Sequence, residues 1–435
     1  MSSLYERDAA VIAGIEKLRF FPLEVVSGHG STLIDPAGRQ LLDLSATWTA
    51  SGLGHGHPAV AAAVAAAVRN APGAGGLSAV HPDSVGLAED LLALVPGTGE
   101  RRVYLGHAGS DANDVALRAC RYATGRRTVV AFEHSYHGGV GVAMGVSGVH
   151  VDAGAAPDPD TVFLPYPNPF RPQHGDVAAD VARCLELAER HLGAGTAACL
   201  IVEPILSDGG LIVPPDGFLA ALHEMCRRYA VPMICDEVKM GLGRPGTLHA
   251  FDHDGVVPDI VTFGKVLGGG LPLSAAVGPA AVLDAPPAAA LLTTAGNPVC
   301  TAAGRAVLAT IVGEQLPQRA AKVGAVLADS LESLRTAPAG EHIGDVRGRG
   351  LAIGVELVDP ATGDRDPRFA AQVVYRAWQL GVVVYYVGGN VLEVTPPLVL
   401  TEDEAIRAAE IVGAAIEDAA AGRVDAEEVA KYAGW

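Results

Sequence analysis

The sequence has no apolar run long enough to cross a membrane, although 49% of its 435 residues are hydrophobic. Glycine, proline or charged residues interrupt each apolar run before the roughly 18 residues that a spanning helix needs. The opening stretch MSSLYERDAAVIAG carries acidic residues early and lacks the basic and then apolar pattern of a signal peptide. These absences predict a cytoplasmic protein that does not bind a membrane.

Paired cysteines and an excess of basic residues are also missing. No two of the six cysteines form a CxxC pair: Cys120, Cys184, Cys199, Cys226, Cys235 and Cys300. Such spacing fits buried thiols in a reducing compartment better than disulfides, and we expect no metal site. The 31 basic residues against 49 acidic ones give a formal charge of −18, which repels phosphate backbones and argues against nucleic acid as a partner.

Short apolar segments alternate with helical stretches from about residue 100. TVVAF (128–132) and VPMICDEV (231–238) read as strands, and DGFLAALHEMCRRYA (216–230) reads as a helix. This alternation predicts an α/β fold with a large, mostly parallel sheet covered on both faces. Ligands bind beyond the carboxyl ends of such strands, which is where Glu203, Asp236 and Lys265 fall.

The rest of the chain predicts a second, smaller α+β unit. GDVRGRGLAIGVEL (344–357) and NVLEVTPPL (390–398) read as its strands. STLIDPAGRQLLDL (31–44) reads as a hairpin whose turn is Pro-Ala-Gly. We predict three parts. These are an N-terminal segment (1–50) that packs with the small domain or a partner subunit, a large domain (51–319) and a small C-terminal domain (320–435).

Polar residues at the predicted strand ends suggest a cofactor site. Asp236 and Val238 share a face if the strand continues through both, so a carboxylate and an apolar support would meet one ring. A carboxylate there would keep a pyridine nitrogen protonated. Lys265 follows the next apolar run, and burial would lower its pKa and suit it to Schiff-base formation. The alternatives are a strand end with a helix cap and an ordinary surface lysine.

GHAGSDANDVALRA places Gly109 and Ser110 just ahead of a helix that begins near Asp111. Free N–H groups at a helix start bind phosphate, although an ordinary N-cap is equally consistent with the pattern. SYHGG adds Tyr136 and His137 after a predicted strand. Tyr136 could stack on a ring or simply pack in a loop.

These motifs occur together and in one order, and the chain resembles the class III, fold-type I aminotransferase family over essentially its full length. The matching stretches are LGHGHPAV, GSDAN, SYHG, EP, DEVKMGLGRPG, PDIVTFGKVLGGGLPLSA, GNP and RGRGLAIGVEL. The resemblance implies pyridoxal 5′-phosphate as cofactor. It also implies a homodimer with a shared active site.

The resemblance further implies a role for each site residue. Lys265 would form the Schiff base, Asp236 would face the pyridine nitrogen, and Val238 and Tyr136 would lie on the two faces of the ring. Gly109 and Ser110 would hold the phosphate, together with Thr293 from the other subunit. Ala108 stands where the family often has serine.

Three positions depart from the amino-acid transaminases of the family. Gly139 and Glu393 stand where those enzymes usually carry arginines for a substrate carboxylate, and Lys239 stands where glutamine is common. Neither glycine nor glutamate can replace bidentate arginine recognition. The substrate is therefore expected to lack a free carboxylate at those positions, unless another group binds it.

These departures resemble one subgroup, the α-amino-ε-caprolactam racemases and related amino-acid amide racemases. Further matches are YERDAAVIAGIEKLRFFPL, LSATWTASGLGHGHP, EPILSDGGLIVPPDGFL, DEVKMGLGR, YRAWQLGVVVYYVG, NVLEVTPPL and the terminal AGW. The expected function is racemisation of an amide or lactam, which needs an acid/base group on each side of the α-carbon. The alternative is an ω- or amine transaminase that acts on carboxylate-free amines.

The resemblance implies Lys265 and Asp208 as the two acid/base groups, with Trp48, Tyr136, Asp208 and Lys239 around the substrate. Three of these residues have an alternative. Strict strand alternation would turn Lys239 away from Val238, toward a salt bridge with Glu237 or Asp254. Asp208 could serve only an Asp-Gly-Gly turn, and Trp48 could serve only core packing.

Overall fold

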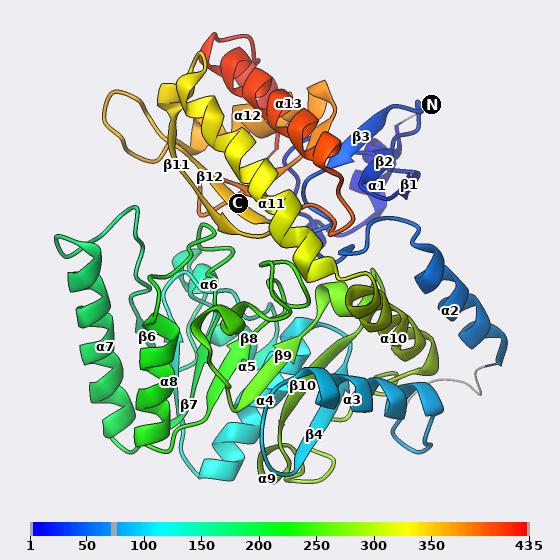
Figure 1. Cartoon of the computed structure of the whole chain (residues 1–435), viewed down its shortest axis with the longest axis vertical. Helices are drawn as coiled ribbons and strands as arrows, with labels where there is room; N and C mark the ends of the chain where they lie inside the picture. Colours follow the sequence, from blue (N-terminus) through cyan, green and yellow to red (C-terminus); the bar gives the residue numbers. More distant parts are fainter. Residues whose placement is uncertain (1–2, 71–75, 433–435) are drawn as a thin grey trace. The chain divides into compact units, whose positions relative to one another are not determined.

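The computed structural model describes residues 3–70 and 76–432, so the C-terminal AGW motif lies outside the described residues. The chain divides into two units (Figure 1). One comprises Met1–His57 and Arg319–Trp435, and the other comprises Pro58–Gln318. The N-terminal segment therefore belongs to the same unit as the C-terminal part.

The larger unit is built on a seven-stranded sheet with the order β4-β10-β9-β8-β7-β5-β6. Its strands are β4 (Arg101–Gly106), β5 (Thr128–Phe132), β6 (Thr161–Leu164), β7 (Ala197–Val202), β8 (Met233–Asp236), β9 (Ile260–Phe263) and β10 (Ser274–Pro279). The strands from β9 to β6 pair in parallel, whereas β10 runs antiparallel to both β9 and β4. The predicted α/β fold with a mostly parallel sheet is confirmed.

Helices surround this sheet (Figure 1). They are α2 (Pro58–Asn70), α3 (Pro82–Leu94), α4 (Gly109–Thr124), α5 (Gly141–Gly145), α6 (Gly148–Asp152), α7 (Val177–Gly193), α8 (Phe218–Arg228), α9 (Ala280–Leu283) and α10 (Pro298–Gly313). The helix predicted from Asp111 begins two residues earlier, at Gly109, because Ala108 already takes the extended N-cap conformation.

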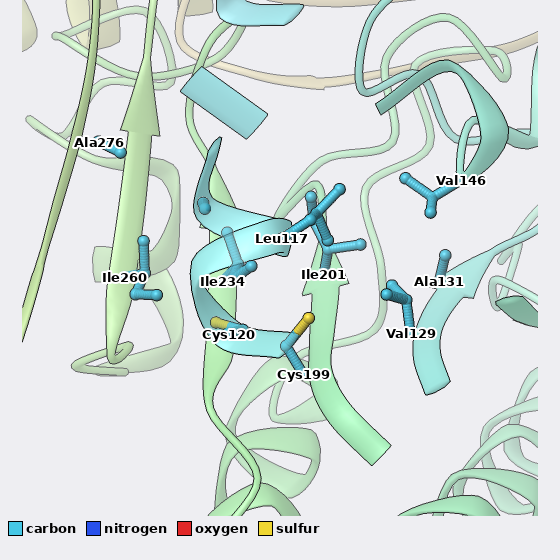
Figure 2. Packing of buried hydrophobic residues seen from close by; sticks show 11 residues of the cluster. Leu117, Cys120, Val129, Ala131, Val146, Cys199, Ile201, Ile234, Ile260 and Ala276 are labelled. Carbon is cyan, nitrogen blue, oxygen red and sulfur yellow. The ribbon is translucent and has the colours of Figure 1, made fainter. Parts of the chain in front are cut away.

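Both faces of the sheet are buried, because each is covered by a helix. On one face, Leu117 and Cys120 of α4 pack on Cys199 and Ile201, which alternate along β7 (Figure 2). On the other face, Phe218 of α8 lies 6.2 Å from Phe132 of β5 between ring centroids. This explains why the strands are apolar throughout rather than alternating.

The smaller unit contains two four-stranded sheets, β1-β2-β3-β13 and β11-β12-β15-β14. Their strands are β1 (Ser27–His29), β2 (Thr32–Ile34), β3 (Gln40–Asp43), β11 (Ile343–Arg349), β12 (Ala352–Leu357), β13 (Val382–Val383), β14 (Tyr385–Val387) and β15 (Val391–Val394). The predicted hairpin is confirmed, since β2 pairs antiparallel with β3. The remaining helices are α1 (Leu4–Val11), α11 (Leu316–Ser333), α12 (Pro367–Leu380), α13 (Glu402–Ala420) and α14 (Ala426–Val429).

Two further expectations concern thiols and membranes. All six cysteines are free and buried, as predicted. Among the described residues, no helix combines the length and the apolar character that a membrane crossing requires.

Candidate active site

The register of the large sheet brings the predicted site residues to one edge. Asp236 is the last residue of β8 and lies opposite Thr262 of the parallel strand β9. Lys265 follows the end of β9 by two residues. Gly106 ends β4 opposite Ser274, the first residue of β10, so α4 begins at the same edge. The carboxyl ends of β8 and β9 and the start of α4 therefore meet, as expected for a ligand site in such a sheet.

Asp236 is held by three hydrogen-bond donors and is only 4% exposed. Its Oδ2 accepts hydrogen bonds from Asn113 Nδ2 at 2.7 Å and from His137 Nδ1 at 2.8 Å. Its Oδ1 accepts one from the N–H of Val238 at 3.0 Å. Because these donors come from α4, from the loop after β5 and from the turn after β8, the carboxylate has a fixed direction at the sheet edge.

Val238 requires a correction to the sequence interpretation. The strand was expected to run through Val238, but β8 ends at Asp236 and a turn follows. Val238 is therefore oriented by this turn and not by strand alternation. A Cβ added to Gly109 would lie 2.4 Å from Val238 Cγ1, and one added to Gly264 would lie 3.0 Å from the Gly109 nitrogen. The start of α4, the end of β9 and Val238 pack so closely that a Cβ at Gly109 would force a shift and one at Gly264 would be tight.

Gly109 and Ser110 are the first two residues of α4, where N–H groups have no acceptor within the helix. The Ser110 hydroxyl accepts a hydrogen bond from the Gly139 N–H at 3.2 Å. Asp111 supplies its carboxylate to the N–H groups of His107 and Ala108, at 2.9 and 3.2 Å. The helix start thus offers main-chain donors of the kind that bind phosphate.

Lys265 is half-buried and opens a short 3₁₀ helix, η3 (Lys265–Gly268). Its φ is +45°, a left-handed value that is uncommon for a residue with a side chain and that clusters at functional sites. The packing of the preceding Gly264 against α4 and Val238 explains why the chain turns so sharply there.

Asp208 and Lys239 form a buried ion pair. Lys239 Nζ lies 2.8 Å from Asp208 Oδ1, and the two side chains are 4% and 7% exposed, respectively. Burial alone would raise the pKa of Asp208, but the charges of Lys239 and Lys265 and a hydrogen bond from Ser207 outweigh it and hold that pKa below its usual value. Asp208 is thus a carboxylate paired with Lys239 and stabilised in addition by the charge of Lys265.

Lys239 contacts Asp208, the acidic residue with which it was predicted to line the substrate pocket. Alternation along a strand would have turned its side chain toward Glu237 or Asp254, but Lys239 lies in the turn after β8 and reaches Asp208. The Glu237 carboxylate accepts hydrogen bonds from the N–H groups of Ala250 and Phe251. Burial raises the pKa of Glu237 to about 8.

Glu203 and Tyr136 lie beside the same edge. Glu203 follows β7 directly, and its Oε1 accepts a hydrogen bond from the Tyr136 N–H at 2.9 Å. Burial raises the pKa of the Tyr136 hydroxyl, and the charge of Asp208 adds to this effect while Lys239 opposes it. The Tyr136 hydroxyl is thus influenced by the charges of the Asp208–Lys239 pair.

Two further predicted residues lie in other parts of the chain. Thr293 is exposed, and its neighbour Thr294 holds His107 Nε2 through Oγ1 at 2.9 Å. Trp48 belongs to the smaller unit, where it stacks on Tyr385 with ring centroids 4.9 Å apart. Trp48 lies in a run of four left-handed residues, Ala46–Thr49, which is unusual for residues with side chains. The roles predicted for Thr293 and Trp48 remain predictions.

Sequence reasoning gave no role to Asn113 or Ser207, and none to His137 beyond its place in a motif. The structure joins Asn113 and His137 to Asp236, and Ser207 to Glu203. Asn113 lies four residues after Gly109, on the same face of α4, so helical spacing could have placed it near the site. Among the described residues, no group of three or more His, Cys, Asp or Glu side chains could hold a metal ion.

The site residues fit pyridoxal phosphate. The buried carboxylate of Asp236, which accepts three hydrogen bonds, can stabilise a protonated ring nitrogen. The main-chain N–H groups at the start of α4 can bind a phosphate. Lys265 at the adjacent strand end suits Schiff-base formation with an aldehyde. A carboxylate, a helix start and a lysine at one edge are the groups that such a cofactor needs.

Comparison with known proteins agrees with this assignment. The model of the aminotransferase class-III family matches residues 15–416. The chain is 35% identical over 394 residues to 4-aminobutyrate aminotransferase of Mycobacterium leprae (strain TN), covering 88% of each protein. It is 34% identical over 448 residues to isoleucine 2-epimerase of Lentilactobacillus buchneri, covering 100% of this chain and 98% of the relative.

A solved structure shows the same architecture. The (S)-enantioselective ω-transaminase from Thermomicrobium roseum superposes with a TM-score of 0.87 at 29% identity, covering 96% of this chain and 98% of that one. The proteins that this chain resembles thus include aminotransferases as well as an epimerase. The chain belongs to the class III aminotransferase family, with the fold of the fold-type I enzymes, and its cofactor is pyridoxal 5′-phosphate.

Proposed function

We propose that this enzyme racemises α-amino-ε-caprolactam or related amino-acid amides by a two-base mechanism. The observation that carries the proposal is the buried Asp208–Lys239 pair, whose carboxylate also responds to the charge of Lys265. Inversion at carbon needs one acid/base group on each side, and Lys265 and Asp208 supply two such groups. The similarity to an isoleucine epimerase supports inversion as a reaction of this scaffold.

Each residue has a defined task in this mechanism. The bound cofactor would draw electrons from the substrate and make its Cα–H acidic. Asp236 would keep a proton on the ring nitrogen, Lys265 would remove or return the Cα proton on one side, and Asp208 would do so on the other. Lys239 holds Asp208 in its ionised form and in position.

The substrate class follows from the two replaced arginines. Gly139 has no side chain, and Glu393 carries a charge that would repel a carboxylate. An amide or lactam has no free carboxylate and therefore needs neither arginine. The second candidate, an ω- or amine transaminase acting on carboxylate-free amines, is favoured by the similarity to the T. roseum transaminase.

Deuterium incorporation separates the two functions. One enantiomer of an α-amino amide is incubated with the enzyme in deuterated water, with and without a keto-acid acceptor. Racemisation predicts loss of optical rotation and deuteration at Cα without an acceptor. Loss of amine only when an acceptor is present would instead establish the transaminase.

The second base is tested by Asp208→Asn. The variant should retain the cofactor absorbance but racemise at least about 100-fold more slowly, as expected for loss of an acid/base group. Exchange of the Cα proton should persist through Lys265, so exchange without inversion would identify Asp208 as the second group. Unchanged racemisation would exclude it.

The enzyme is further proposed to be a homodimer in which Thr293 completes the partner's phosphate site. Its exposed side chain is consistent with such a contact. Lys265→Ala and Thr293→Ala variants should each be impaired alone. Mixed dimers should regain one intact site if Thr293 acts across the interface, whereas no recovery in verified mixed dimers would exclude it.

A further inference from the structure

The turn that carries Thr293 is attached at one end to helix α10. Asn297 is the N-cap of α10, and its Oδ1 accepts hydrogen bonds from the N–H groups of Val299 and Cys300 at 3.1 and 3.0 Å. The same side chain reaches back along the chain, since Asn297 Nδ2 donates to the Thr294 carbonyl at 3.0 Å. The start of α10 therefore holds the main chain of Thr294.

Two contacts join this turn to the end of β4. The Thr294 hydroxyl oxygen lies 2.9 Å from Nε2 of His107, the residue that directly follows β4. Gly296 is buried beside Leu105 of β4, and a Cβ added to Gly296 would lie 3.5 Å from Leu105 Cδ1. The turn is thus attached to β4 through one polar contact and one apolar contact.

The start of α4 holds His107 in turn. The main-chain N–H of His107 donates to Asp111 Oδ2 at 2.9 Å, and the N–H of Ala108 donates to the same oxygen at 3.2 Å. Asp111 is fixed to β10, because Ser274 Oγ donates to its Oδ1 at 2.7 Å. The main chain of His107 is therefore held independently of its imidazole, so the contact with Thr294 can be removed without releasing that main chain.

We propose that His107 is a positioning residue that holds Thr294 and thereby places the neighbouring Thr293 to complete the phosphate site of the partner subunit. The inference rests on the proposed role of Thr293 across a homodimer interface. It concerns cofactor binding alone and is therefore independent of the reaction that the enzyme catalyses.

Preorganisation explains why a contact to Thr294 matters for Thr293. An exposed side chain on a free turn loses conformational freedom when a ligand immobilises it, and this loss weakens binding. Thr293 and Thr294 share a peptide bond. Holding Thr294 at both its carbonyl and its hydroxyl limits the conformations that Thr293 can adopt, so the cofactor binds with a smaller loss of entropy.

One short segment therefore serves two phosphate sites. The main-chain N–H groups of Gly109 and Ser110, at the start of α4, belong to the site of their own chain. The imidazole of His107, just before them in the sequence, serves the site of the partner through Thr294. A substitution of His107 should consequently weaken the partner's site and spare its own.

Mixed dimers test this division. One subunit is wild type, and the other carries His107→Ala, Lys265→Ala and a different affinity tag. Only the wild-type subunit can form the Schiff base, and its phosphate site takes Thr293 from the subunit that lacks His107. Equilibrium titration with pyridoxal 5′-phosphate, followed by absorbance, should give an affinity about 3- to 10-fold weaker than in the reference dimer of wild type with Lys265→Ala, as expected for one lost hydrogen bond.

The reverse arrangement measures the effect of His107 on its own site. One subunit carries His107→Ala and the other carries Lys265→Ala. The site that forms the Schiff base then belongs to the His107→Ala subunit, whereas its Thr293 comes from a subunit with an intact His107. Its affinity should stay within about twofold of the reference dimer, because Asp111 still holds the main chain at position 107. Equal losses in the two arrangements, a loss only in this one, or no loss in either would overturn the proposal.

Two further variants separate the contact from a general defect. In the first arrangement, His107→Gln should retain the affinity of the reference dimer, because the glutamine amide offers Thr294 a hydrogen-bonding group in place of Nε2. A glutamine variant as weak as the alanine variant would contradict the proposal. His174→Ala is the matched control and should change neither arrangement, because the exposed His174 contacts Asp180 of α7 instead, at 2.9 Å.

Thr293→Ala separates this inference from the proposed role of Thr293. It replaces His107→Ala in the first arrangement and, in a second dimer, in the reverse one. If Thr293→Ala weakens the partner's site and His107→Ala does not, only the role of His107 is overturned. If Thr293→Ala weakens neither site, the proposed role of Thr293 fails and the inference fails with it.

Discussion

Asp236 and Asp208 are both buried carboxylates at the carboxyl edge of the large sheet, but different donors hold them. Asp236 receives its hydrogen bonds from an amide, an imidazole and a main-chain N–H. Asp208 is held chiefly by the ammonium group of Lys239, with Lys265 contributing through its charge. The first site is fixed by three donors from a helix, a loop and a turn, and the second chiefly by one long side chain in a turn.

The two arrangements of donors suit two different functions. A group that must stay charged and stationary benefits from several short donors, since no single fluctuation releases it. A group that must accept and release a proton needs nearby charges that stabilise its two protonation states differently. The Asp236 site therefore suits permanent stabilisation of a ring, and the Asp208 site suits proton transfer.

Asp236→Asn should produce the largest effect. The amide cannot hold a proton on the ring nitrogen, so activity should fall about 1000-fold or more, within the range known for acid–base groups. The absorbance of the bound cofactor and the initial rate measure the effect. Asp254→Asn is the control, because Asp254 also binds main-chain N–H groups, those of Gly217 and Leu219, but away from the sheet edge. Similar losses in both variants would contradict a special role for Asp236.

Lys239→Met should lower the free energy of unfolding by about 3–5 kcal/mol, because it leaves the Asp208 charge buried without its closest partner. Denaturant unfolding of the cofactor-loaded enzyme measures the loss. Lys322→Met removes an exposed pair with Glu402 and should cost no more than about 1 kcal/mol.

A double variant makes the Lys239 prediction stricter. Adding Asp208→Asn to Lys239→Met removes the buried charge and should recover part of the lost stability. If the losses of the two single variants simply add in the double variant, Lys239 and Asp208 are not energetically coupled. The proposed difference between the Asp208 and Asp236 sites would then be wrong.

Gly109→Ala should weaken cofactor binding about 10- to 100-fold, corresponding to the 1–3 kcal/mol typical of overpacking. The added methyl group would lie 2.4 Å from Val238 Cγ1 and would push the turn after β8 away from the start of α4. Equilibrium titration with the cofactor measures the affinity. Gly125→Ala at the other end of α4 has open space around it and should affect only the helix end. Wild-type affinity in Gly109→Ala would show that the turn can shift freely.

The sequence was sufficient to predict the sheet edge and its main residues. Strands that are apolar throughout, separated by helices, imply a parallel sheet, and such a sheet places its ligands beyond the carboxyl ends. Asp236, Lys265 and the start of α4 follow from this rule. The error at Asp111 was small, because helix starts depend on the conformation of one residue, here Ala108.

The contacts within the site could not be predicted. Asn113 and Asp236 are 123 residues apart, and no local pattern specifies that their side chains meet. The alternative drawn from strand alternation does not describe Lys239, because the chain leaves the strand at Asp236 and a turn resets the direction of every following side chain. The pairing of Lys239 with Asp208 depends on where two separate turns converge, which is a property of the tertiary structure.

Glu237, next to Asp236, should give an effect that depends on pH. Its pKa rises from the ordinary 4.5 to about 8, chiefly through burial, so the folded protein holds a proton that the unfolded chain has lost between these values. The free energy of unfolding should therefore decrease as pH rises from about 4.5 to 8 and change little through this group above that. Glu237→Gln should flatten this slope, and exposed Glu89→Gln should leave it unchanged. An unaltered slope in Glu237→Gln, measured by denaturant unfolding across the range, would show that Glu237 is ionised in the fold. Asp236 and Glu237 would then both be charged, buried carboxylates, and they would differ only in the groups that donate hydrogen bonds to them.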